Sequence, residues 1–291
     1  MSIRFHVGVD GGGTGSRVAI VAADRPDRPV LARAEGGPGG LGLGLNAAWR
    51  NILATLAAAF AQLGEPDVPL AQCSLGMGLA GVHNRDWAAR FAAMAPACGA
   101  LRIDTDGFTT LLGAHDGRPG AIIAVGTGVV GEVWRAGGSR HTVSAWGFPA
   151  GDEGGGAWLG LRAAQLAQRA LDGRGPRGAL AGAVIDHFGG SVDAAFAWLG
   201  AARQTEFAQL APLVLAHADA DPDAVALLRA AGREIADVAD ALDPDHSLPL
   251  ALCGGLGLAL QRWLPPALQA HVSAPLGDSV DGALILARQV A

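Results

Sequence analysis

The sequence predicts an α/β protein built from two similar halves. Apolar, β-branched runs alternate along the chain with Ala- and Leu-rich runs of helical spacing, and a glycine-rich turn between two apolar runs occurs twice. With 291 residues, half of them hydrophobic, the chain is long enough for one large or two modest domains. We place the boundary between two domains at residues 116 and 117.

The first half opens with a strand, a turn and a strand. In "HVGVDGGGTGSRVAIVAA", residues 6–23, the run Val18–Ala22 is β-branched and follows the glycines as a second strand, not as a helix. Helical spacing then covers residues 46–64. The next expected elements are a buried strand, a short helix, a strand and a helical segment, over 73–82, 86–97, 101–107 and 108–117.

The second half repeats this opening. "AIIAVGTGVVGEVWR", residues 121–135, is again strand, glycine turn and strand. A polar, glycine-rich segment at 146–160 precedes residues that are mostly helical to about residue 243. A buried strand then leads into "LCGGLG", and a final helix at about 278–290 could pack back on the N-terminal domain.

Composition excludes several classes of protein. All 21 basic residues are arginine, so a Walker-type phosphate loop, which needs a lysine, is excluded. The dinucleotide fingerprint fails as well, because Ser16 stands where its third glycine belongs. The net charge of −6 argues against a nucleic-acid partner.

Cysteine usage and hydropathy predict a cytoplasmic protein with no membrane partner. Cys73, Cys98 and Cys253 are far apart and fit no metal-ligand spacing, which is typical of a reducing compartment. No segment reaches about 18 uncharged apolar residues, and no basic region precedes an apolar one at the start of the chain.

The two glycine turns form the candidate phosphate site. Backbone N–H groups can approach a phosphate where no Cβ intervenes, and Asp10 is a hard oxygen ligand suited to Mg²⁺. An ordinary Asp-Gly hairpin is the alternative, although such a hairpin needs only two turn residues. The residues predicted to contact phosphate are Gly11, Gly12, Gly13 and Thr14 in the first turn and Gly126, Thr127 and Gly128 in the second.

Carboxylates and glycines that follow predicted strands are the candidates for the catalytic base, the sugar site and the adenosine site. Asp104 and Asp106 end a strand, where catalytic residues of open α/β folds lie, and a carboxylate there can take the proton of an acceptor hydroxyl. Asp106 is the stronger candidate, with a helix N-cap as its alternative role. Asp152 and Glu153 could bind sugar hydroxyls or begin a helix. Gly254 and Gly255 could admit adenosine or form a tight turn.

In this order the motifs resemble those of the actin-like sugar kinases and, more narrowly, of the N-acetylglucosamine kinase family of BadF/BadG/BcrA/BcrD-type ATPases. "VGVDGGGT", "AVGTG" and "LCGGLG" resemble its two phosphate motifs and its adenosine motif, and "DTDG", "WGFPAGDEGGGAWLG" and "PLGDSVDGALILA" also match. The resemblance covers essentially the whole chain. It implies two actin-like (ribonuclease H-like) domains, 1–116 and 117–291, around a nucleotide cleft that closes over ATP and an amino sugar.

The resemblance also implies roles for single residues. Asp106 matches the general base, and Asp10 and Thr14 match the Mg²⁺ and phosphate positions. One departure lies in "GGPGGLG", where Gly40 replaces an asparagine that touches the sugar in the family and leaves more room. The residues expected to bind the sugar are Asp106, Trp146, Gly147, Asp152, Glu153, Gly39 and Gly40.

The function implied is ATP- and Mg²⁺-dependent phosphorylation of the 6-hydroxyl of N-acetylglucosamine by a homodimer, with glucosamine as the alternative substrate. An activator-type ATPase that drives electron transfer through an iron–sulfur cluster is a distant alternative, because it needs paired cysteines. A filament-forming or chaperone-like actin relative would need large insertions that this length excludes.

Overall fold

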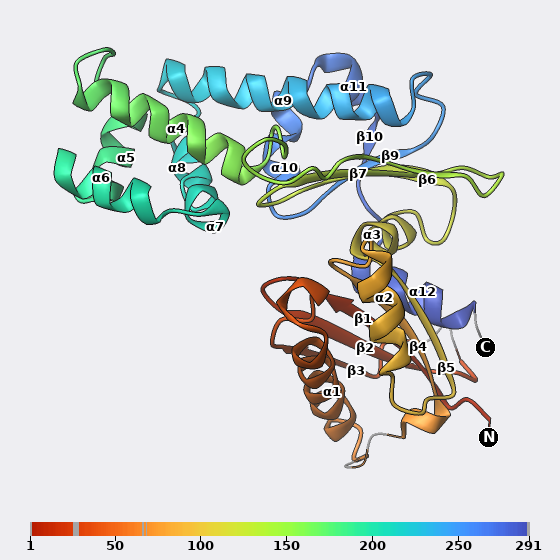
Figure 1. The fold of residues 1–291 in the computed structure, drawn as a ribbon. Helices are drawn as coiled ribbons and strands as arrows, with labels where there is room; N and C mark the ends of the chain where they lie inside the picture. Colours follow the sequence, from red (N-terminus) through yellow and green to blue (C-terminus); the bar gives the residue numbers. More distant parts are fainter. Residues whose placement is uncertain (1, 26–28, 66, 68, 290–291) are drawn as a thin grey trace. The chain divides into compact units, whose positions relative to one another are not determined.

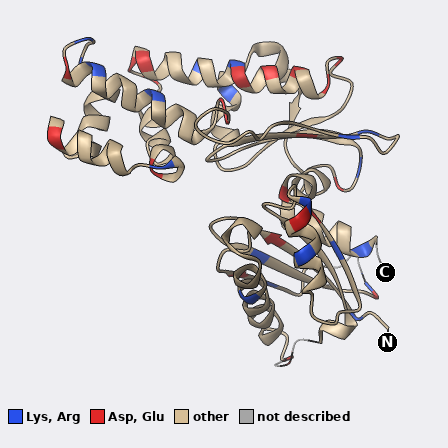
Figure 2. Ribbon diagram, viewed as in Figure 1, with Lys and Arg blue, Asp and Glu red and all other residues tan. Residues whose placement is uncertain are grey.

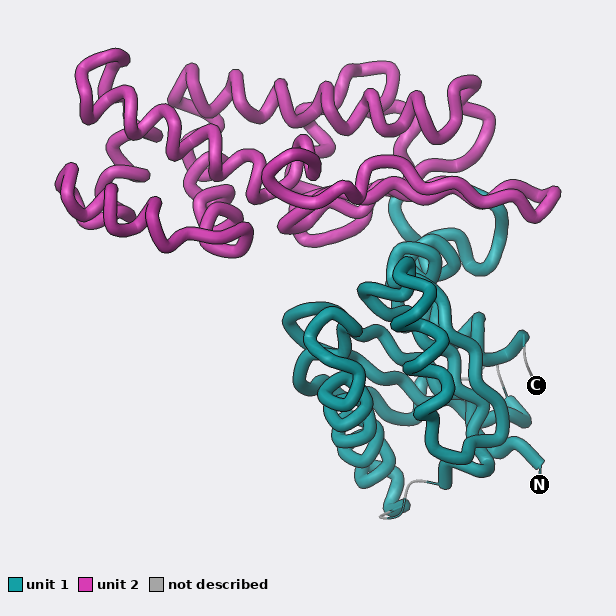
Figure 3. The backbone as a smooth tube through the Cα atoms, in the orientation of Figure 1, with its two compact units in different colours: residues 1–120, 274–291 teal, residues 121–273 magenta. Residues whose placement is uncertain are grey.

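The chain divides into two compact units in a computed structural model that describes residues 2–25, 29–65, 67 and 69–289. The first unit comprises residues 1–120 and 274–291, and the second comprises residues 121–273 (Figure 3). The chain therefore leaves the first unit close to the predicted boundary and returns to it for the last helix.

The first unit is built on a mixed five-stranded sheet of order β3-β2-β1-β4-β5 (Figure 1). The first three strands are antiparallel neighbours, and β4 and β5 add to β1 in parallel. The strands are β1 (Phe5–Gly11), β2 (Ser16–Ala22), β3 (Ala32–Gly36), β4 (Cys73–Leu79) and β5 (Ala100–Thr105). The helices are η1 (Leu41–Leu43), α1 (Leu45–Ala61), η2 (Leu70–Gln72), α2 (Arg85–Ala93), α3 (Asp106–Ala114) and α12 (Ser279–Arg288).

Alternation along β1 gives this sheet two buried faces. Val7 and Val9 point to the face that α1 covers and pack in one core with Ile52. Gly8 points to the other face, where a Cβ would lie 2.6 Å from the carbonyl oxygen of Val280. Helix α12 therefore packs on β1 and β4 at a distance that only glycine permits, which explains the small residues in this part of the sequence.

The second unit repeats the strand order of the first. Its five-stranded sheet reads β8-β7-β6-β9-β10, so each strand has a counterpart in the order β3-β2-β1-β4-β5. The strands are β6 (Gly120–Val125), β7 (Val129–Trp134), β8 (Arg140–Ser144), β9 (Leu250–Cys253) and β10 (Val272–Ser273). This arrangement confirms the predicted α/β class with two similar halves.

Helices make up most of the second unit. The longest, α9, packs on β7, where Gly131 leaves room for Val238 and Leu242. None of the described helices is long and apolar enough to cross a membrane. Figure 2 shows acidic and basic residues interspersed over both units. The helices are α4 (Gly156–Leu171), α5 (Ala179–Phe188), α6 (Val192–Ala201), α7 (Gln204–Ala208), α8 (Ala211–Ala216), α9 (Pro222–Leu242), α10 (Gly257–Leu260), η3 (Gln261–Trp263) and α11 (Pro266–His271).

Candidate active site

Residues 11–15, here called the first tip, comprise the last residue of β1 and the turn that leads into β2 at the end of their antiparallel ladder. The N–H of Gly12 donates to the carbonyl of Gly15 at 2.9 Å, which closes the turn. The loop after β3 is tied to the same place, because the N–H groups of Gly39 and Gly40 donate to the carbonyl of Gly12 at 3.1 and 2.9 Å. Thr14 is exposed beside them. The structure therefore brings together the predicted phosphate residues and the predicted loop.

A polar hollow of about 360 Å³ opens beside the first tip. Asp10 and Thr14 line it together with Glu35, so both predicted ligands of the metal and the phosphate face the same space. The complete lining is Asp10, Gly12, Thr14, Gly15, Ser16, Arg17, Glu35 and Gly36.

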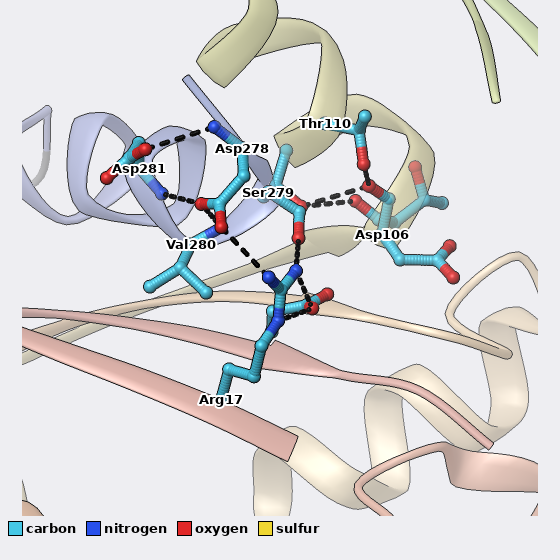
Figure 4. A network of polar contacts seen from close by, with 10 residues as sticks. Arg17, Asp106, Thr110, Asp278, Ser279, Val280 and Asp281 are labelled. Carbon is cyan, nitrogen blue, oxygen red and sulfur yellow. Dashed lines mark hydrogen bonds and ion pairs between the residues drawn. The ribbon is translucent and has the colours of Figure 1, made fainter. Parts of the chain in front are cut away.

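Arg17 is a residue of this site that the sequence analysis missed. It lies directly opposite Asp10 in the β1–β2 ladder, and its Nη2 and Nε donate to Asp10 Oδ2 at 2.7 and 3.0 Å. Its guanidinium also donates to Asp278 Oδ2 at 2.9 Å and to Ser279 Oγ at 2.8 Å (Figure 4). Burial lowers the pKa of Arg17, but the two carboxylates outweigh it and hold that pKa above its usual value. Arg17 thus joins the end of β1, beside the first tip, to the start of α12.

Asp106 is the first residue of α3 and is mostly shielded from water. Thr105 caps the helix by accepting the N–H of Phe108 at 3.1 Å, while Asp106 Oδ1 accepts the N–H of Gly107 at 3.0 Å. Burial raises the pKa of Asp106, and the charge of Asp10 raises it further, against the opposing effects of the Gly107 amide and His83. A carboxylate with a raised pKa is a better proton acceptor. Asp106 therefore lies at a helix start and also has the raised pKa expected of a general base.

Asp104, the other acid of "DTDG", has a local role. It lies on β5, and its Oδ1 accepts the N–H of the next residue, Thr105, at 2.8 Å. That contact supports the turn into α3.

The residues around Asp10 fit a magnesium ion that is completed by a nucleotide. The Nε and Nη2 donors of Arg17 bind Oδ2 of Asp10, and this 18% exposed carboxylate borders the polar hollow. The described residues contain no group of three or more His, Cys, Asp or Glu side chains that could hold a metal by themselves. One carboxylate with phosphate and water ligands is the arrangement that Mg²⁺ commonly takes.

Residues 126–128, here called the second tip, connect β6 and β7. The N–H groups of Gly156 and Ala157, at the start of α4, donate to the carbonyls of Gly126 and Thr127 at 2.8 and 2.9 Å. Thr127 is exposed. The start of α4 therefore fixes the backbone of the second tip.

A buried carboxylate holds the other side of the second tip. Asp152 is 5% exposed, and its Oδ1 accepts the N–H of Val129 at 3.2 Å while its Oδ2 accepts the Nε2–H of Gln204 at 2.8 Å. A Cβ on Gly128 would lie 2.6 Å from the Cγ of Asp152, so only glycine fits beside it. Gln204 is a second residue that the sequence analysis missed.

The loop that carries Asp152 has unusual backbone conformations. Ser144, Ala145 and Asp152 have φ values of 64°, 65° and 64°, which are left-handed and rare outside glycine. Such positions often mark functional sites. Trp146 is 87% exposed in this loop, and Gly147 accepts the N–H of Gly151 at 2.8 Å.

Glu153 lies near a different partner from Asp152. Its charge raises the pKa of Arg162, although burial lowers that pKa more. The guanidinium of Arg162 stacks 3.5 Å from the ring of Trp158. The two acids of "GDEGGG" therefore face different surroundings.

The turn after β9 lies against the second tip. The N–H of Leu256 donates to the carbonyl of Val125 at 3.0 Å, and a Cβ on Gly254, whose φ is 82°, would overlap that same carbonyl. Gly255 has open space around it. Both predicted adenosine glycines are thus exposed next to the second tip.

Comparison with known proteins gives one family and several relatives. Residues 7–259 match the BadF/BadG/BcrA/BcrD ATPase family. Glucosamine kinase GspK of Vibrio cholerae is 31% identical and covers 98% of this chain and 96% of its own length. An N-acetylmuramic acid/N-acetylglucosamine kinase of Clostridium acetobutylicum is 26% identical over 63% of this chain and 60% of its own.

The crystal structure of a Chromobacterium violaceum protein, described provisionally as an N-acetylglucosamine kinase, is also similar. It is 52% identical to this chain, with a TM-score of 0.94, and the match covers 99% of this chain and 100% of that one.

Proposed function

Because the chain belongs to the BadF/BadG/BcrA/BcrD ATPase family and is a sugar kinase with an actin-like fold, we propose that it phosphorylates the 6-hydroxyl of N-acetylglucosamine with ATP. The family match confirms the resemblance predicted from the motifs. The observation that carries the proposal is Asp106, a shielded carboxylate with a raised pKa that lies within electrostatic reach of Asp10 and the first tip.

In the proposed reaction Asp106 is the general base. It accepts the proton of the sugar 6-hydroxyl as that oxygen attacks the γ-phosphorus of ATP and the bond from that phosphorus to the β,γ-bridging oxygen breaks, which releases ADP. The helix start of α3 keeps the carboxylate in place. The N–H of Gly12 closes the turn, so other N–H groups of the first tip and the hydroxyl of Thr14 bind the transferred phosphoryl group in this proposal. Positioning and electrostatic stabilisation supply most of the catalysis in phosphoryl transfer.

Asp10 would hold Mg²⁺ in the bound state. The ion would neutralise charge on the ATP phosphates as it develops. Arg17 keeps the Asp10 carboxylate oriented through Oδ2.

The second unit supplies further contacts in this proposal. The second tip binds phosphate through its backbone, and Gly254 and Gly255 admit the adenosine. Asp152 accepts hydrogen bonds from the sugar hydroxyls, with Trp146, Gly147 and Glu153 near the bound sugar. Support comes from the exposure of the glycines and from the fixed orientation of Asp152.

Glucosamine is the second candidate substrate: one observation favours it, and a second removes an argument for N-acetylglucosamine. The relative from Vibrio cholerae that matches nearly the whole chain is a glucosamine kinase. In addition, a Cβ on Gly39 or Gly40 would lie 2.9 Å or 3.3 Å from the backbone of the first tip. The small residues of this loop therefore serve its packing on the tip, and they are not evidence of extra room for an acetyl group.

The test is a coupled ADP-release assay with N-acetylglucosamine, glucosamine, N-acetylmannosamine and glucose. We expect kcat/KM to favour N-acetylglucosamine over glucosamine by at least about tenfold, or roughly 1.4 kcal/mol of transition-state binding. The opposite preference would assign the chain to glucosamine. ADP release with none of the four sugars would overturn the proposed reaction.

A further inference from the structure

Gln204 lies outside every motif of the sequence analysis, yet its side chain binds the most buried carboxylate of the candidate site. Its Nε2 donates to Asp152 Oδ2 at 2.8 Å, in a contact that joins residues 52 positions apart. We propose that Gln204 is a positioning residue for sugar binding that acts through Asp152. This proposal rests on the proposed function, in which Asp152 accepts hydrogen bonds from the sugar.

The backbone of Gln204 is held in a defined place. Gln204 is the first residue of α7, and the side chain of Glu206 accepts the N–H of Arg203 at 2.8 Å, which fixes the start of that helix. Phe207 is buried, and a Cβ on Gly160 of α4 would overlap its carbonyl oxygen. Because α7 lies this close to α4, the amide of Gln204 meets Asp152 from a fixed direction.

The surroundings of Asp152 leave its carboxylate few orientations. Its backbone is left-handed, with a φ of 64°, and Gly128 lies too close for any larger residue. The N–H of Val129 holds one oxygen and Gln204 holds the other. Removing the amide of Gln204 therefore frees one end of the carboxylate.

The chemistry of this partner suits a carboxylate that also binds a ligand. An ionised carboxylate has about four lone-pair sites, and each oxygen of Asp152 uses one of them here. The amide of Gln204 donates one hydrogen bond and is uncharged, so it leaves the negative charge of the carboxylate in place, whereas an arginine would offset that charge. Asp152 thus keeps lone pairs for sugar hydroxyls while its orientation is fixed.

The test compares Gln204→Leu with a matched change at the other end of the same helix. Gln209→Leu is the control, because Gln209 is exposed and follows the last residue of α7. We expect Gln204→Leu to raise the KM for the amino sugar about tenfold, the usual effect of losing a hydrogen bond to a charged group. The KM for ATP and the melting temperature should stay close to those of Gln209→Leu.

A second variant and a binding measurement protect the test against a folding defect. Gln204→Asn keeps the amide but shortens the side chain. Like Gln204→Leu, it should raise the KM for the amino sugar. The amino sugar alone should also raise the melting temperature of both Gln204 variants less than that of the wild type.

The possible failures are distinguishable. A wild-type enzyme that phosphorylates no amino sugar would overturn the proposed function, and this proposal with it. An active wild type with an unchanged sugar KM in Gln204→Leu, or with equal increases in the KM for sugar and ATP, would overturn only the positioning role of Gln204.

Discussion

The two glycine tips occupy the same place in two sheets of the same strand order, but different groups hold them. At the first tip the backbone N–H groups of Gly39 and Gly40 hold the turn, and the nearby carboxylate of Asp10, on β1 itself, pairs with Arg17. At the second tip β6 ends with Val125, which is fully buried, and the carboxylate comes from Asp152 in a later loop. A repeated fold can therefore support two glycine turns by unrelated means.

The difference separates the chemical roles of the two acids. Asp10 borders a polar hollow and shares Arg17 with Asp278, so its negative charge is available to a metal ion nearby. Asp152 is buried between a backbone N–H and an amide, so its first role is to hold the tip. We expect changes at the first tip to act mainly on turnover, and changes at the second tip to act on stability and ligand affinity.

The largest effect should come from Asp106, which acts beside the first tip. Asp106→Asn removes the proposed proton acceptor while keeping a similar shape, so kcat should fall by about 10²–10⁴-fold with ATP affinity retained. Steady-state kinetics with titration calorimetry for ATP would measure both. Asp104→Asn is the control, and we expect it to keep most of the activity. A kcat near that of the wild type in Asp106→Asn would place the base elsewhere.

The second effect concerns the carboxylate of Asp10, which precedes the first tip. Asp10→Ala should lower kcat/KM for Mg-ATP by about 10²-fold, because the phosphates lose the metal ligand, and it should leave the sugar KM nearly unchanged. A magnesium titration of activity checks this. Asp24→Ala, at an exposed acid after the same hairpin, is the matched control. An unchanged magnesium dependence would show that Asp10 only pairs with Arg17.

Ionisation of Asp106 should affect activity and stability in opposite directions: as pH rises, activity should increase and the contribution of Asp106 to stability should decrease. Activity needs the ionised carboxylate, so it should rise with pH through a pKa above the ordinary value of 3.8. The folded chain binds this proton more tightly than the unfolded chain. The contribution to stability is therefore fully present below the unfolded pKa and is lost as pH rises through the folded pKa.

Kinetics and thermal unfolding over the same pH range would check both signs. Asp106→Asn should gain stability relative to the wild type as pH rises through this window. An acid limb of activity at or below the ordinary aspartate value would contradict the raised pKa.

Local patterns predicted most of the fold and supplied most residues of the candidate site, whose roles stay predictions. The glycine tips and Asp106 follow from strand and turn chemistry within a few residues. The edge strands β3 and β8 were missed, because they are short and largely exposed and so lack an apolar run. The pairs Arg17–Asp278 and Gln204–Asp152 were missed for another reason. They join residues 261 and 52 positions apart, and only the folded chain brings them together.

The smallest expected effect comes from comparing alanine substitutions at two glycines of the second tip, Gly128 and Gly126. A Cβ on Gly128 would meet the carboxylate of Asp152, whereas one on Gly126 would meet nothing within 4 Å. Gly128→Ala should therefore lower the free energy of unfolding by about 1–3 kcal/mol, the usual cost of overpacking. Gly126→Ala should keep the stability of the wild type and raise the KM for ATP, because its methyl group obstructs phosphate.

A double-mutant cycle decides whether the carboxylate is the cause. In an Asp152→Ala background Gly128→Ala has nothing to displace, so its additional cost should fall to near zero. Urea unfolding of the four proteins gives the coupling energy directly. If the effects of Gly128→Ala and Asp152→Ala on the free energy of unfolding were simply additive, Asp152 would not be what holds this turn. The difference between the two tips would then be only that Asp10 places a charge beside the first.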